Sequence, residues 1–174
     1  VNTESEIKSL SGEFPLVSFH KTVRDGSELY GKPYIFINDI FNIATKLLRS
    51  DDVFVLCNSD IVIDQHFYNE NIFKIQSGQL TLATRFNISD REAIIGLDYD
   101  CGIDVFIAKV SSLGRLDMMN FCLGVPFWDF WLPLQALIKG FSVRKIQFPL
   151  ALHVTHPENY SHQNLQKSGV EFLS

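Results

Sequence analysis

The sequence has few cysteines and no excess of basic residues. Its three cysteines, Cys57, Cys101 and Cys122, are an odd number at wide spacings without a Cys-x-x-Cys pair. We therefore expect reduced thiols in a cytoplasmic protein rather than a disulfide framework or a cysteine zinc site. Lys and Arg number 15 against 20 Asp and Glu, a formal charge of −5. A negative chain is not expected to bind nucleic acid through phosphate contacts.

The sequence also lacks a long uninterrupted apolar run. The most apolar stretch, 121–138, contains residues that a lipid-spanning helix tolerates poorly: Gly124, Pro126, Asp129 and Pro133. We therefore expect no transmembrane segment, and we predict that this stretch is buried or forms a site. Residues 1–10 are polar and carry no apolar signal core, and the chain begins with Val, so a cut or processed piece is expected.

Length and composition favour one globular domain over 1–174. The chain has 174 residues, of which 46% are hydrophobic and 20% charged, and it has no internal repeat or linker-like segment. Alternating patterns predict an α/β layered sheet. Strands are expected at 15–20, 53–57, 80–86, 104–109 and 143–152, the last interrupted at Pro149; helices at 38–49, 64–75 and about 130–138; and irregular segments at 24–32 and 96–102.

The sequence also predicts where one strand lies in the sheet, how one helix is capped and which face of another is apolar. The continuous apolar run at 53–57 is typical of a central strand covered on both faces. Asn38 or Asp39 is placed to cap the helix at 38–49. The last predicted helix has an apolar face and ends at Gly140; the face consists of Phe130, Leu134, Leu137 and Ile138.

Polar residues that follow strands are the first functional candidates, since ligands of α/β sheets bind at the carboxyl ends of strands. Asn58-Ser59-Asp60 follows the strand at 53–57, and a carboxylate there can hold a divalent cation together with a diphosphate. The alternative is a turn that caps a following helix. His153, His156 and His162 cluster after the last strand, where metal or phosphate binding competes with a solvent-exposed loop.

Asp129 is the candidate general base. It lies between bulky aromatic residues at the start of a helix, so burial would raise its pKa while the helix N-terminus would lower it. The alternative is a capping Asp with tryptophans in the core. Two other motifs are excluded or absent: the P-loop-like segment 26–32 is followed by Pro33 instead of a hydroxyl residue, and no His-x-x-x-His or His-Glu-x-x-His helix supports a metal-dependent hydrolase.

The order of these motifs resembles the GT-A-type glycosyltransferases, and most closely a group of short glycosyltransferase-like proteins. The resemblance covers most of 52–162. Its most specific part is the pairing of Trp-Asp-x-Trp with His-x-x-His. The segments that carry it are Asn58–Ile61, Arg85, Gly102–Phe106, the Gly-x-Pro-x-Trp-Asp-x-Trp motif at 124–131, the Leu-His-x-x-His-Pro motif at 152–157 and the Tyr-Ser-His motif at 160–162.

The resemblance implies a GT-A-like mixed sheet flanked by helices and a metal-dependent sugar transfer. Asp60, with His153 and His156, would bind Mn²⁺ or Mg²⁺, and Asn58 stands in place of the first acid of the usual Asp-x-Asp. Asp129 would be the base that deprotonates an acceptor hydroxyl. The remaining residues would contact the nucleotide-sugar donor or other substrate: Asn58, Ser59, Arg85, Asp104, Trp128, Trp131 and His162.

One departure concerns the N-terminal part. GT-A folds begin with strands that hold the nucleotide base, and this chain starts after the point where they would lie. We therefore expect a fold that lacks the first strand or strands and is either incomplete or reduced. The predicted function is transfer of a sugar from a nucleotide-sugar to an unknown acceptor. The alternatives are a non-catalytic nucleotide-sugar or glycan-binding module and, more remotely, a metal-dependent hydrolase.

Overall fold

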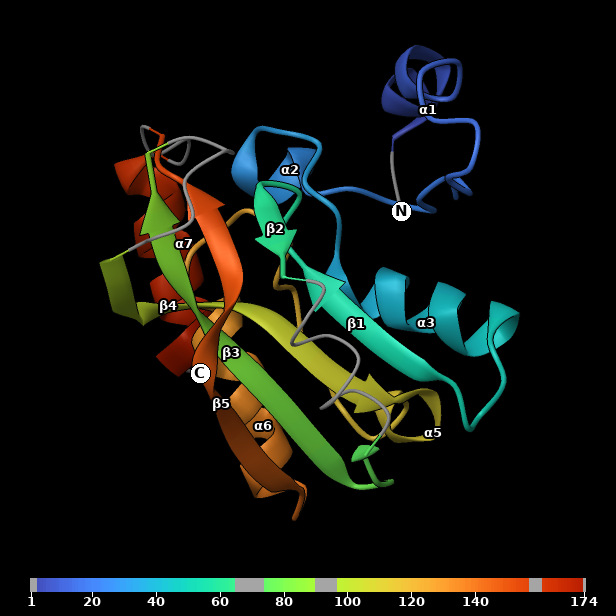
Figure 1. The fold of residues 1–174 in the computed structure, drawn as a ribbon. Coiled ribbons are helices and arrows are strands. Elements are labelled where there is room, and N and C mark those ends of the chain that lie inside the picture. The colour runs from blue at the N-terminus through green and yellow to red at the C-terminus, as the bar shows by residue number, and fades with distance from the viewer. Residues whose placement is uncertain (1–2, 65–73, 90–96, 157–160, 174) are drawn as a thin grey trace.

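The computed structural model describes residues 3–64, 74–89, 97–156 and 161–173. Helices flank one mixed sheet, as Figure 1 shows. The elements in chain order are α1 (Glu4–Leu10), α2 (Ser27–Tyr30), α3 (Ile37–Leu47), β1 (Val53–Cys57), β2 (Ile61–Ile63), β3 (Gln79–Ile88), β4 (Leu97–Lys109), α5 (Val110–Leu113), α6 (Trp128–Ile138), β5 (Ser142–Val154) and α7 (His162–Leu173).

The five strands are ordered β1-β4-β3-β5-β2. β3 and β5 are parallel, and the other neighbouring pairs are antiparallel. The prediction of an α/β protein with a mixed sheet flanked by helices is therefore confirmed. Among the described residues, no helix combines the length and apolarity needed to cross a bilayer.

Both faces of the sheet are buried, because successive residues of the central strands pack into apolar clusters on opposite sides. On one face Phe106 and Leu82 pack with α3 and α6, and on the other Ile107 and Ala83 belong to a second apolar cluster. This division follows from the two-residue repeat of a strand, which sends successive side chains to opposite faces. Phe106 also contacts the start of α6, with its ring centroid 5.3 Å from that of Trp128.

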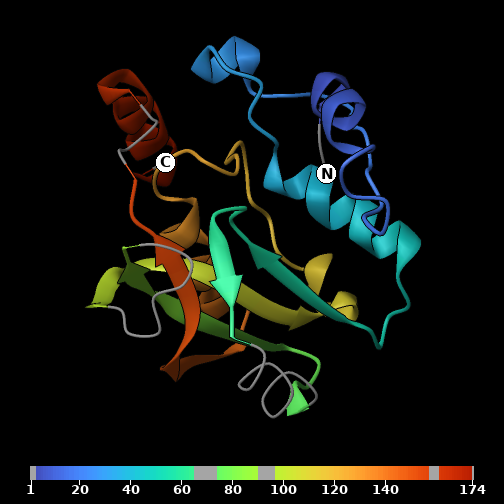
Figure 2. The ribbon, with the colours of Figure 1, turned by 45° about the horizontal axis from the view of Figure 1, so that its top comes forward.

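The sheet must bend sharply where β1 is joined to β2. These strands lie at opposite edges, yet only Asn58, Ser59 and Asp60 connect them. Four extended residues reach at most ~14 Å from Cys57 to Ile61, whereas four strand spacings in a flat sheet would separate the edges by ~19 Å. The two edges therefore approach each other at this end, and Figure 2 shows β1 and β2 meeting there.

β5 is one continuous strand that contains an irregularity at Pro149. Ala83 pairs with Ile146, but Arg85 pairs with Ala151, so Thr84 alone lies opposite residues 147–150. Proline cannot donate a hydrogen bond to a sheet and is tolerated in such irregular positions. The shifted register places His153 opposite both Asn87 of β3 and Ile61 of β2.

Several predictions about individual elements were wrong. The strand at 53–57 has the predicted bounds, but it is an edge strand, and the central β4 extends into residues 97–102, which we expected to be irregular. Residues 15–20 form turns and coil instead of a strand, and 24–32 contains the short helix α2. The helix predicted at 64–75 falls largely outside the described residues.

The predicted cap of α3 was also wrong. The helix begins at Ile37, after Phe36, which makes no side-chain capping bond. The Asn38 side chain instead accepts a hydrogen bond from the Met118 amide at 3.0 Å and donates one to the Met119 carbonyl at 3.2 Å. This side chain ties α3 to the segment that leads into α6.

The helix α6 buries the face opposite to the one that the apolar pattern singled out. Its buried residues are Trp128, Leu132, Gln135 and Ala136, while Phe130, Leu134, Leu137 and Ile138 are exposed. The helix is apolar on nearly all sides, so counting apolar residues does not identify its packed face.

We predict that Phe106→Ala destabilises the fold by about 3–5 kcal/mol, because it removes a fully buried ring that joins the sheet to α6. Guanidinium chloride unfolding followed by circular dichroism measures this change. Leu47→Ala, at an exposed position of α3, is the control and should change stability by less than about 0.5 kcal/mol. Equal stability of the two variants would contradict this role of Phe106.

Candidate functional site

A cavity of about 500 Å³ lies at the end of the sheet where β1 meets β2. This volume is in the range of about 300–1,000 Å³ that small-molecule sites occupy. Every predicted site residue except Trp131 and His162 lines it. The lining consists of Asn58, Ser59, Asp60, Arg85, Gly102, Asp104, Leu123, Gly124, Val125, Pro126, Phe127, Trp128, Asp129, Phe130, His153, His156 and Leu165.

Asp60, His153 and His156 form a compact cluster in this cavity. The Asp60 Oδ2 atom lies 2.8 Å from His156 Nε2 and 3.3 Å from His153 Nε2. One ligand atom from each residue can be chosen so that all three lie within 4.8 Å of one another. Asp60 Oδ1 is buried and has no hydrogen-bond partner among the residues that the structure describes. A cation between these atoms would satisfy that oxygen.

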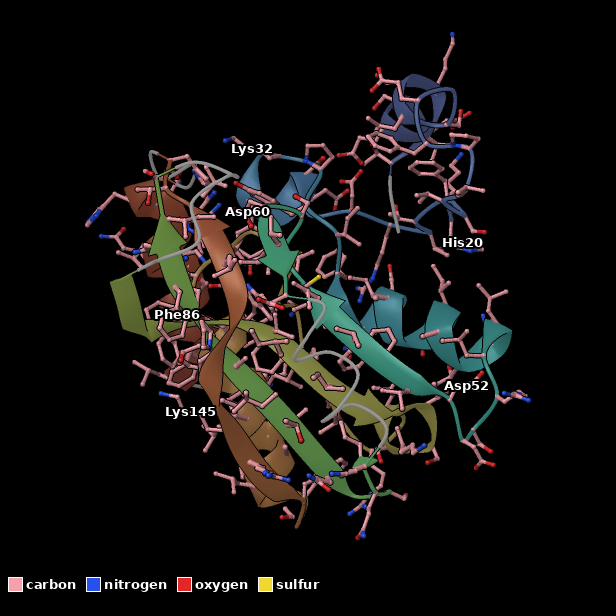
Figure 3. The ribbon with its side chains drawn as sticks, viewed as in Figure 1. His20, Lys32, Asp52, Asp60, Phe86 and Lys145 are labelled. Atoms are coloured by element: carbon pink, nitrogen blue, oxygen red, sulfur yellow. The ribbon has the colours of Figure 1, made fainter. Side chains whose placement is uncertain are left out.

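The sheet register brings the cluster together. Asp60 immediately precedes Ile61, which pairs with His153, so the carboxylate lies beside the end of β5, as Figure 3 shows. Thr155 then holds the chain between the two histidines, because its amide and hydroxyl both donate to the Ile88 carbonyl, at 3.0 and 3.2 Å. Asp60 does not cap a helix, since a strand follows it.

The donor set and its charges suit a divalent ion. Burial alone would raise the pKa of Asp60, but the hydrogen bond from His156 and the nearby His153 outweigh it and lower the pKa. Burial, reinforced by the charge of Arg85, lowers the pKa of His153 and favours its neutral form, which is the form that binds metals. One carboxylate with two imidazoles is a set that Mn²⁺ and Zn²⁺ accept more readily than the oxygen-seeking Mg²⁺.

Asp104 organises the polar floor of the cavity. Its side chain is almost completely buried, and it accepts hydrogen bonds from Asn58 Nδ2 at 2.7 Å and Arg85 Nη1 at 3.4 Å. Burial raises the pKa of Asp104, although Arg85 and Asn58 oppose the shift. The carboxylate therefore fixes one amide and one guanidinium at the cavity wall.

Asp129 lines the same cavity from the first turn of α6. Burial raises its pKa to about 6, aided by the charge of Asp104 and opposed by backbone amides, including its own and that of Phe130. Asp129 is not the helix cap: that position belongs to Phe127, which has a left-handed φ of 74° and makes no side-chain capping bond. A carboxylate with this pKa is ionised at neutral pH and is a stronger base than an exposed one.

Trp131 and His162 lie apart from the cavity lining. The Trp131 indole donates to the Asp117 carbonyl at 2.9 Å, and its ring packs against Phe121 and Phe172. His162 is the first residue of α7, with Nε2 3.3 Å from Gln166 Nε2. Trp128 borders the cavity, but most of its surface is buried. Trp131 thus serves packing.

The sequence reasoning missed Asn87 and Phe127. Asn87 Oδ1 lies 3.2 Å from His153 Nδ1. Its signal was available, because Asn87 and Arg85 are two residues apart in β3 and so share one face of the strand. The left-handed backbone of Phe127 has no sequence signal, since glycine and asparagine are the residues that usually adopt it.

Comparisons of this chain with protein-family models, with curated proteins and with solved structures found no match. The geometry of the cavity is therefore what indicates a function for this protein.

We predict that Asp129→Asn makes the protein more stable than the parent above pH 6 and that this advantage disappears on acidification. A raised folded-state pKa contributes stability that is present below the unfolded pKa and lost as pH rises through about 6. The stability of Asp129→Asn relative to the parent should increase by up to about 3 kcal/mol between about pH 4 and about pH 8. Urea unfolding at a series of pH values measures it.

The control for this experiment is Asp51→Asn, which changes an exposed carboxylate. Its stability relative to the parent should be nearly independent of pH. A flat difference for Asp129→Asn would mean that the Asp129 carboxylate is not desolvated.

Proposed function

We propose that this protein is a GT-A-like glycosyltransferase that moves a sugar from a nucleotide-sugar to an acceptor hydroxyl with the help of a divalent metal. The observation that carries the proposal is that one cavity is lined both by the cluster of Asp60, His153 and His156 and by the desolvated carboxylate of Asp129. Direct displacement by an acceptor hydroxyl uses two functions in one site: charge stabilisation of a leaving diphosphate and a base for the acceptor.

The metal would be held by Asp60, His153 and His156. When bound, it supplies positive charge that stabilises the departing diphosphate. Mn²⁺ fits the two imidazoles better than Mg²⁺. Arg85 would add a second positive group for the phosphates, and its bond to Asp104 keeps the guanidinium at the cavity wall.

Asp129 would be the base on the acceptor side. Its carboxylate accepts the proton of the acceptor hydroxyl while the hydroxyl oxygen forms a bond to the anomeric carbon. The bond from that carbon to the diphosphate oxygen breaks, and the diphosphate takes the electron pair. A pKa of about 6 leaves the carboxylate ionised at neutral pH and raises its basicity above that of an exposed Asp.

The arrangement of the elements supports a GT-A-like fold without its first strands. Asp60 follows a strand, Asp129 lies at the head of a helix, and the histidines follow the last strand of a mixed sheet. No strand element precedes β1 within residues 3–52, so β1 would hold the position of the strand before the metal-binding motif.

A metal-dependent hydrolase is the second candidate, because the three metal-ligating residues are also compatible with hydrolysis. Three protein ligands leave open positions on a divalent ion, which is the arrangement of catalytic sites that activate water. In that case water would replace the acceptor hydroxyl in the same cavity.

We predict that Asp60→Ala weakens Mn²⁺ binding at least about 100-fold, because it removes the only carboxylate of the donor set. Isothermal titration with Mn²⁺ alone, and then with Mn²⁺ together with UDP or GDP, measures the change. Asp51→Ala removes an exposed carboxylate and should bind as the parent does. If Asp60→Ala binds as tightly as the parent, the metal assignment is wrong.

We also predict that Asp129→Asn lowers the rate of transfer by about 10²- to 10⁴-fold and leaves donor affinity nearly unchanged, since a base acts in the transition state. Turnover with a panel of nucleotide-sugars and acceptors measures the rate, and titration measures donor affinity. Donor binding by the parent without transfer or hydrolysis would instead indicate a binding module. Release of free sugar with or without acceptor would indicate the hydrolase.

A further inference from the structure

Asn87 contacts the cluster of Asp60, His153 and His156 through the His153 ring nitrogen that does not face Asp60. Its Oδ1 atom lies 3.2 Å from Nδ1 of His153. The contact is built into the sheet, because Asn87 and His153 are paired residues of the parallel strands β3 and β5. His153 is almost completely buried, so its ring has little freedom to turn away from this partner.

In this hydrogen bond the donor can be only His153. An amide oxygen can only accept a hydrogen bond, so Nδ1 of His153 must carry the proton. In the neutral ring, Nε2 then has a free electron pair. This electron pair faces Asp60 Oδ2 at 3.3 Å, and a neighbouring Oδ1 atom of the same carboxylate has no partner among the described residues.

We propose that Asn87 is a positioning residue that holds His153 in the Nδ1–H tautomer and so presents Nε2 to a divalent cation. Facing electron pairs on Nε2 and a carboxylate repel each other unless a cation or a proton lies between them. The inference deepens the proposed function, since it rests on the metal site of Asp60, His153 and His156.

The second histidine of the cluster is arranged differently. His156 Nε2 lies 2.8 Å from Asp60 Oδ2, a distance at which the ring donates a proton to the carboxylate. Its side chain is 41% exposed, so solvent can exchange that proton. The two imidazoles therefore differ in their contacts: Nδ1 of His153 is bonded to Asn87, whereas Nε2 of His156 is bonded to Asp60.

The first test is a long-range ¹H–¹⁵N spectrum of the imidazoles in the metal-free protein, with His153 assigned from a His153→Ala variant. We expect the Nδ1–H tautomer in the parent and in Asn87→Asp, which keeps an acceptor oxygen at the same place. Asn87→Leu should shift His153 toward Nε2–H, which donates to Asp60. An Nε2–H tautomer in the parent would overturn the proposal without any variant at Asn87.

The second test is titration of the same proteins with Mn²⁺. Asn87→Leu should bind about 10- to 100-fold more weakly than the parent, whereas Asn87→Asp should bind at least as tightly. Asn42→Leu, an exposed amide on α3, is the matched control and should bind as the parent does. Equal losses for Asn87→Leu and Asn87→Asp, or no loss for Asn87→Leu, would overturn the positioning role.

The two tests separate failure of this inference from failure of the proposed function. A parent that shows the Nδ1–H tautomer but binds no Mn²⁺ would remove the metal from the proposed function and keep the tautomer assignment. A parent that binds Mn²⁺ while Asn87→Leu binds it equally well would keep the metal site and remove the role of Asn87.

Discussion

The three-residue connection from β1 to β2 is the constraint on which the rest of the site depends. It joins strands at opposite edges of the sheet, so it can exist only if the sheet bends until those edges meet. That bend places Asp60 beside the end of β5 and places Asn58 over Asp104. A longer connection would relax the bend, and the cavity would lose the wall that carries both residues.

Different neighbours give the carboxylates of one cavity different protonation behaviour. The pKa of Asp60 is lowered because the imidazoles outweigh the effect of burial, whereas burial dominates at Asp129 and raises its pKa to about 6. Two carboxylates whose environments move their pKa values apart can serve as anion and as base in one reaction. The separation comes from neighbours: histidines surround one, and the aromatic start of α6 surrounds the other.

The sequence was informative where the signal was local. The apolar run of β1 has the predicted bounds. Asp60, His153, His156 and Asp129, which the resemblance in motif order singled out, line one cavity. Nonlocal features were missed. β1 is an edge strand because, among the described strands, it pairs with β4 alone, and β4 lies far from it in sequence. No pattern within residues 53–57 indicates this pairing. The packed face of α6 was hidden because the helix is apolar on nearly all sides. Asn87 was overlooked because it lies just after the strand predicted at 80–86, whereas β3 extends to Ile88.

The positions of β1 and β2 at opposite ends of the strand order also affect how the chain folds. Among the described residues, each pairs with a strand made later, β1 with β4 and β2 with β5, and β5 is followed by the helix α7. During synthesis the apolar residues of β1 emerge before the β4 residues with which they pair, and exposed apolar strands are open to aggregation and to chaperone capture. Long-range pairing of this kind slows folding, because the loop entropy is lost before the contacts form. The Asp60 cluster requires β2 to be paired with the end of β5, so it cannot form before β5 is in place.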